Sequence, residues 1–274
     1  MPAKAGAPLG IVQVFPTTSP QSKETADLIE RLRGDVIPAA EKGTALRVHV
    51  GGQTAIFDDF ADVLTGKLPL FLAVIVGLGF LLLLIAFRSL LVPLTAAVMN
   101  VLAAAASFGV VVAFFQFGWG SEPFGLGAAG PVEAFLPVIM LAILFGLSMD
   151  YQVFLVSRMH EEWVHGRDNR RAIVVGQAET GRVITAAATI MIAVFVAFVF
   201  GGERAIAEFG VGLAAAVAID AFILRTVLVP AVMHLFGKAN WWLPPWLDRR
   251  LPHLSVEGPA TEPEPERRPE PVAS

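Results

Sequence analysis

Long apolar runs alternate with short polar stretches through most of the chain, and they predict five transmembrane helices. The runs occupy residues 68–87, 90–117, 135–157, 183–201 and 211–236. Each is close to or above the ~20 residues that an α-helix needs to cross roughly 30 Å of hydrocarbon. Residues 67–237 are therefore predicted to form a membrane all-α bundle of five transmembrane helices.

Shorter periodicities before residue 67 predict a small α/β segment ahead of the apolar runs. Residues 11–15 are an apolar run and residues 46–50 alternate apolar with polar side chains, so both are expected as strands. Apolar residues recur at helical spacing between and after them: Leu28, Leu32, Val36, Ile56, Phe60, Val63 and Leu64. Residues 1–66 are thus expected to form a βαβα unit. Its sheet is incomplete, because two strands rarely bury enough surface to stand alone.

The residues after the last apolar run predict a cytoplasmic interfacial segment at 238–254 and a disordered tail at 255–274. The tail is rich in Pro and Glu, a composition that cannot bury enough apolar surface to fold. Tryptophan at the headgroups with cations in the water is typical of a membrane anchor. The residues concerned are Trp241, Trp242, Trp246, Arg249 and Arg250.

The distribution of Lys and Arg predicts the orientation of the chain. The stretch 158–182 carries five arginines, whereas 118–134 has no Lys or Arg and 202–210 has only Arg204. Basic loops stay in the cytoplasm, so residues 1–66 are expected outside and the C-terminus inside. The first residues lack the apolar core of a signal peptide. We therefore expect a fragment of a longer protein or one half of a split one.

Composition and charge exclude several other classes of protein. The chain is 55% hydrophobic and 16% charged, which is wrong for a soluble domain. Its net charge of −4 gives no electrostatic support for a nucleic-acid partner. It has no cysteine, and its five histidines lack metal-ligand spacing, so we expect no metal site and no enzyme. Residues 125–130 match the dinucleotide-binding pattern GxGxxG. That pattern needs a strand before it and a helix after it, whereas here Pro131 follows and the match lies between two apolar runs. We therefore expect no cofactor site.

The strongest chemical signal is Asp150, which lies inside the third apolar run. It is about fifteen residues into that run, roughly 22 Å at 1.5 Å per residue. An ionisable group there costs ~2.5–3.5 kcal/mol and usually marks a proton relay; the alternative is a structural carboxylate bonded inside the bundle. Tyr151, the only tyrosine, can donate a hydrogen bond to a carboxylate across a helix interface; the alternative is that it only fills apolar space. Gly146, one turn earlier, would permit a close helix approach.

Asp220 lies near the middle of the last apolar run, with Arg225 five residues later. Five residues correspond to 140° around an α-helix, so the two are not expected to pair directly. Asp220 is interpreted either as a second relay member or as the partner of a basic group elsewhere. Asn100, in the second run, is interpreted as a polar contact between helices.

The residues around Asp150 closely resemble the MMPL (mycobacterial membrane protein large) transporters of the resistance–nodulation–division superfamily. The resemblance lies in residues 145–163, 130–137, 181–188 and 240–244. It implies helices eight to twelve of a twelve-helix transporter, preceded in residues 1–66 by the C-terminal part of its second periplasmic porter domain. It also implies that Asp150 and Tyr151 match the Asp-Tyr pair of the tenth helix, which acts with an Asp-Tyr pair of the fourth.

The expected function is that of the C-terminal half of an exporter in the bacterial cytoplasmic membrane. As the resemblance implies, the cargo is lipid or another hydrophobic molecule and the energy source is the proton gradient. The partner is the N-terminal half of the transporter or a homologous subunit. The alternative is a fragment or accessory membrane subunit that does not transport.

Overall fold

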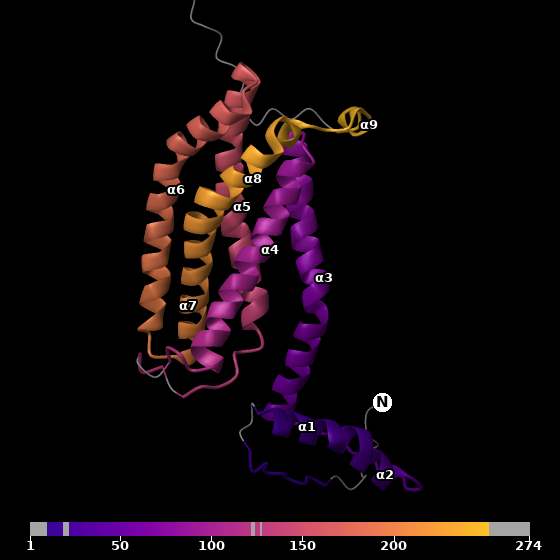
Figure 1. Cartoon of the computed structure of the whole chain (residues 1–274). Helices are drawn as coiled ribbons and strands as arrows, with labels where there is room; N and C mark the ends of the chain where they lie inside the picture. Colours follow the sequence, from indigo (N-terminus) through magenta and orange to yellow (C-terminus); the bar gives the residue numbers. More distant parts are fainter. Residues whose placement is uncertain (1–9, 19–21, 122–123, 127, 252–274) are drawn as a thin grey trace, which may run out of the picture. The chain divides into compact units, whose positions relative to one another are not determined.

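The computed structural model describes residues 10–18, 22–121, 124–126 and 128–251, and all regular elements within them are helices (Figure 1). Packing divides the chain into two units. The first comprises Met1–Leu68 with Glu133–Phe135, and the second comprises Pro69–Val132 with Leu136–Ser274. The tail expected at 255–274 lies outside the described residues.

The first unit is built from helices joined by extended chain. Helix α1 (Lys23–Arg31) begins after Ser22, whose side chain accepts a hydrogen bond from the backbone N–H of Thr25 at 3.4 Å. It continues through a π-helical turn, η1 (Leu32–Val36), into α2 (Ile37–Glu41). Helix α3 (Gln53–Phe87) begins in this unit.

The two strands expected in the first unit are not found among the described residues. Residues 11–15 are extended and largely exposed, and residues 46–50 are also without strand pairing. A strand needs a neighbouring backbone for its hydrogen bonds. In the second stretch a side chain takes that role, because the N–H of Val48 donates to Glu41 Oε1 at 2.7 Å. The α/β prediction is therefore not supported for this chain by itself.

Five helices are long and apolar enough to cross a membrane, as predicted, among the residues that the structure describes. They are α3 (Gln53–Phe87); α4 (Leu91–Val111) with η2 (Val112–Gln116); α5 (Leu136–Gly166); α6 (Asn169–Val199); and α7 (Arg204–Ala218) with η3 (Ile219–Leu228) and α8 (Val229–Phe236).

The helices extend beyond the apolar runs at several ends. The stretch 158–182, which reads as a loop from its charge, is helical except for a tight turn at Arg167 and Asp168. The Asp168 side chain caps α6 by accepting from the N–H of Arg170 at 2.9 Å. Hydropathy thus located the apolar parts of these helices, whereas the start of α6 is set by the Asp168 cap.

The second unit packs α6 against α5 and α7, and α4 against α7 and α5 (Figure 1). One apolar cluster joins α4, α5 and α7 and includes Val111, Phe115, Met140 and Leu213. Small residues let the helices approach closely. A Cβ on Gly210 would lie 2.7 Å from the Phe195 carbonyl oxygen on α6.

Candidate functional site

A buried arginine is the centre of a polar network between α4, α5 and η3. Arg225 is 1% exposed, and its Nε donates to Asp220 Oδ2 at 2.9 Å. Its Nη1 donates to Gln152 Oε1 at 2.9 Å. Its Nη2 donates to the Ser148 hydroxyl at 2.7 Å and also to the Ser148 carbonyl oxygen. The guanidinium therefore uses four of its five N–H donors within the described chain.

The direct pair between Asp220 and Arg225 corrects the expectation from helical spacing. That expectation assumed α-helical geometry, in which residues five apart point in different directions. Residues Ile219–Leu228 instead form the π-helix η3, whose backbone hydrogen bonds join residues five apart. Its wider turn brings Asp220 and Arg225 onto one face. Asp220 is therefore the partner of a basic group on its own helix.

The network continues from the arginine to α4. The Ser148 hydroxyl accepts from Arg225 and donates to Asn100 Oδ1 at 2.6 Å. Asn100 is 2% exposed, so its amide lies inside the bundle as a contact between helices. Each buried polar group in this chain of contacts has a hydrogen-bonding partner, which is the condition for a stable polar network in an apolar interior.

Around residues 146–154, helix α5 has one buried face that contacts Arg225 and one exposed face. Ser148 and Gln152, four residues apart, share the face that contacts Arg225. Asp150, two residues from each, is about 200° around the helix from both, and it lies on the exposed face of this chain. Gly146 and Phe154 are exposed on that same face.

Tyr151 lies between these two faces and is half-buried. The Arg225 guanidinium carbon is 5.7 Å from the centre of its ring, within the range of a cation–π contact. Its hydroxyl donates to the Met191 sulfur on α6 at 3.5 Å. Tyr151 therefore connects α5 both to the buried network and to α6.

A second buried acid, Glu208, lies near the start of α7. Its side chain is fully buried, and Oε1 accepts from Arg204 Nε at 3.0 Å. The same guanidinium donates to the carbonyl oxygens of Ala128 at 2.7 Å and Gly130 at 2.9 Å. Arg204 thus ties the connection between α4 and α5 to α7, and the pair has a structural role.

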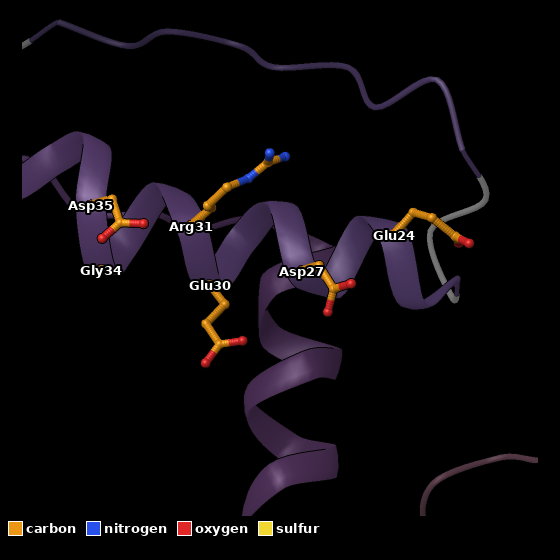
Figure 2. Close-up of a pocket in the computed structure, with 6 residues that line it drawn as sticks. All are labelled: Glu24, Asp27, Glu30, Arg31, Gly34 and Asp35. Carbon is orange, nitrogen blue, oxygen red and sulfur yellow. The ribbon is translucent and has the colours of Figure 1, made fainter.

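The first unit contains an open acidic concavity along α1 and η1. Figure 2 shows Asp27 and Glu30 on one side of the helix and Arg31 pointing away from them. Hydrogen bonds from its own backbone and from Ser22 lower the pKa of Glu24, at one end of this concavity. Within the described parts of the chain, no His, Cys, Asp and Glu side chains converge as a metal site.

Sequence reasoning missed Ser148 and Gln152 as members of the site. A signal for them exists, because two polar residues four apart within an apolar run share one helix face. Each is an ordinary residue in a transmembrane helix, where Ser and Gln side chains commonly bond across helices. The π-helical geometry that brings their partner into reach is not visible in the pattern.

These features define a multi-pass membrane protein with charged groups held inside its helical bundle. Residues 10–256 match the MMPL family. The chain is 44% identical over 258 residues to "Membrane protein YdfJ" of Bacillus subtilis, covering 94% of this chain and 35% of that protein.

Two mycobacterial relatives carry names that state an activity. The chain is 38% identical over 243 residues to "Mycolic acid-containing lipids exporter MmpL11" of Mycolicibacterium smegmatis, covering 89% of this chain and 25% of that protein. It is 38% identical over 237 residues to "Trehalose monomycolate exporter MmpL3" of the same organism, covering 86% of this chain and 23% of that protein. The chain belongs to the MMPL family of membrane proteins. It spans about a third or less of the length of these relatives.

Proposed function

We propose that this chain is the C-terminal part of a proton-coupled lipid exporter, in which Asp150 carries the proton. The observation that carries the proposal is the position of Asp150 on an exposed face of an apolar helix. A charged carboxylate deep in hydrocarbon costs ~2.5–3.5 kcal/mol on insertion scales. In a working assembly this face therefore meets protein or a water-filled pathway rather than lipid.

The surroundings of Asp150 suit contact with a further part of the protein. Gly146 lies one turn before it, and a Cβ there would have nothing within 4 Å beyond its own stretch of the helix, among the described residues. A small residue next to an acid leaves room for another helix to approach closely. The relatives are about three to four times longer than the matched region. They therefore contain enough further sequence to supply such a helix.

The Arg225 network gives Asp150 a fixed orientation. It binds Ser148 and Gln152, which flank Asp150 on the opposite face of α5. Rotation of α5 about its axis would break these hydrogen bonds. A proton carrier needs defined distances to its donor and acceptor, and the network supplies that constraint from three helices. Asp220 accordingly acts as the charge partner of Arg225.

The cargo is proposed to be lipid, on the printed activities of the two mycobacterial relatives. The N-terminal segment is proposed to contribute to a porter domain outside the membrane. Its exposed stretches at 11–15 and 46–50 would become strands when a neighbouring sheet is present. Reporter fusions test the orientation: residues 125 and 206 should be outside, and residues 165 and 250 inside.

The deciding experiment compares two charge-removing variants in a complex reconstituted with the N-terminal part of the transporter. Asp150→Asn is nearly isosteric but does not titrate, so it should abolish lipid export driven by a proton gradient while leaving assembly intact. Glu203→Gln removes an exposed charge just before α7, and it should export normally. Normal export by Asp150→Asn would disprove the relay. Export by neither the parent complex nor its variants would favour the accessory-subunit alternative.

A further inference from the structure

The segment that follows the last long helix is tied to the turn between α3 and α4. The segment comprises residues 237–251 and includes η4 (Gly237–Trp241) and α9 (Pro245–Asp248) (Figure 1). The Ser89 hydroxyl donates to the Asn240 carbonyl oxygen. Arg88 Nε donates to Asp248 Oδ1 at 2.9 Å, and its Nη2 donates to the Asp248 carbonyl oxygen at 2.8 Å.

Contacts inside the bundle hold the first half of this segment. Asn240 is 1% exposed, and its Nδ2 donates to the Met233 carbonyl oxygen at 2.6 Å. Trp241 Nε1 donates to Asn169 Oδ1 at 2.9 Å, and its ring stacks on Trp163 with centroids 5.8 Å apart. The segment is therefore held at the end of the bundle by α5, α6 and α8 together with the α3–α4 turn.

The outward side of the segment combines tryptophan with positive charge. Trp242 is 56% exposed and Trp246 is 64% exposed. Lys238, Arg249 and Arg250 are also exposed. Tryptophan prefers the level of the lipid headgroups, where its ring is in apolar surroundings and its N–H is wet. This set therefore suits a membrane surface better than bulk water.

The charge of this surface is positive, because its one acid is already paired. Asp248 binds Arg88 of the neighbouring turn, so it does not neutralise Arg249 or Arg250. Basic side chains at the membrane surface attract anionic headgroups, and each contributes a roughly fivefold preference. A surface fixed by backbone and side-chain hydrogen bonds presents these charges without first having to fold.

We propose that residues 237–250 form a fixed collar that binds the headgroups of anionic phospholipids in the leaflet at this end of the bundle. Trp242 and Trp246 insert between the headgroups, while Arg249 and Arg250 bind the phosphates. The collar does not depend on proton coupling or on cargo. Its test therefore remains valid whatever the outcome of the export experiment.

The test uses the full chain in phosphatidylcholine bilayers that contain a small fraction of dibrominated lipid. Bromine quenches tryptophan fluorescence at short range. Quenching by brominated phosphatidylglycerol is compared with quenching by brominated phosphatidylcholine at the same mole fraction. The signal that disappears in Trp242→Phe/Trp246→Phe belongs to the collar. We expect a clear preference of these two tryptophans for phosphatidylglycerol, weakened by added salt.

Paired arginine variants separate specific binding from general charge attraction. Arg249→Gln/Arg250→Gln should lower the relative affinity for phosphatidylglycerol by about 25-fold, the product of two fivefold contributions. Arg170→Gln/Arg171→Gln removes another adjacent pair of exposed arginines, at the start of α6, and should leave the preference unchanged. Equal quenching by the two brominated lipids in the unmodified chain overturns the proposal, as does an equal loss in both double variants.

Discussion

Replacing Arg225 with methionine removes the centre of the intramembrane network without a large change in side-chain volume. Asp220, which is 3% exposed, would then lose its charge partner. Breaking a buried pair by removing one member typically costs ~3–5 kcal/mol, because an uncompensated charge remains. Gln152 Oε1 and the Ser148 carbonyl oxygen would also lose a donor. We expect Arg225→Met to destabilise the chain by about 4 kcal/mol.

A second substitution tests whether the uncompensated charge is the cause. In Asp220→Leu/Arg225→Met the buried charge is gone, and an apolar replacement of a whole buried pair is often close to neutral. The remaining cost comes mainly from Gln152 Oε1, which loses its donor, and amounts to about 1–3 kcal/mol; the Ser148 carbonyl oxygen lies inside the α5 helix and keeps its place in the helical hydrogen bonding. The double variant should therefore be more stable than Arg225→Met by roughly 2 kcal/mol.

The assay is reversible unfolding of the purified chain in mixed micelles, followed by far-ultraviolet circular dichroism as the denaturing detergent fraction rises. Arg225→Lys is a useful third variant, because a lysine ammonium cannot reproduce the planar fork of arginine. It should lie between the parent and Arg225→Met. The reasoning is refuted if Arg225→Met unfolds within ~0.5 kcal/mol of the parent, or if the double variant is less stable than the single one.

Three further substitutions test single contacts by the same unfolding assay. Tyr151→Phe loses only a weak donation to the Met191 sulfur, so its stability should change by less than ~1 kcal/mol, and a larger loss would mean an unrecognised bond. Gly210→Val places a Cβ against the Phe195 carbonyl oxygen and should destabilise the α6–α7 contact by about 1–3 kcal/mol; a neutral result would contradict the close approach. Gly146→Val meets open space in this chain. It should leave stability nearly unchanged but weaken co-purification with the N-terminal part of the transporter, whereas undiminished association would argue against contact at this face.

The five long helices could be predicted well from the sequence, because an apolar run of about twenty residues has the length that a membrane span requires. The ends of these helices could not be predicted in the same way. Residues 158–182 carry enough arginine to read as a loop, yet the chain remains helical through most of them. A run of charge reports which part of a helix lies in water and not where the helix ends; here the Asp168 side chain caps the start of α6.

The error at Asp220 has a different origin, since the residues were identified correctly and only their geometry was wrong. An α-helical spacing assumes 100° per residue. Neither Asp220 nor Arg225 reveals that the backbone between them is π-helical. One physical reason for the π-helix is visible only in three dimensions. The wider turn lets Arg225 reach Asp220 and α5 together, which satisfies two buried charges at once.

The expected strands would need a neighbouring sheet to form. The alternating pattern at 46–50 describes a surface that is half-buried when a sheet surrounds it. By itself the stretch has only the Glu41 side chain as a hydrogen-bond acceptor for its Val48 N–H. The alternating pattern therefore did not predict the structure of this stretch, because the described residues provide no neighbouring strand.

Asp150 occupies an exposed position on α5, and our proposal is that a further surface covers it in the working assembly. Helix α5 carries polar side chains on two faces, and the described bundle provides hydrogen-bonding partners on one of them. One side of α5 is satisfied here, through Ser148, Gln152 and Arg225. The other side presents Asp150 on an exposed face, where lipid would penalise its charge. The satisfied side holds the helix in one rotation, and that rotation keeps Asp150 directed outward from the bundle.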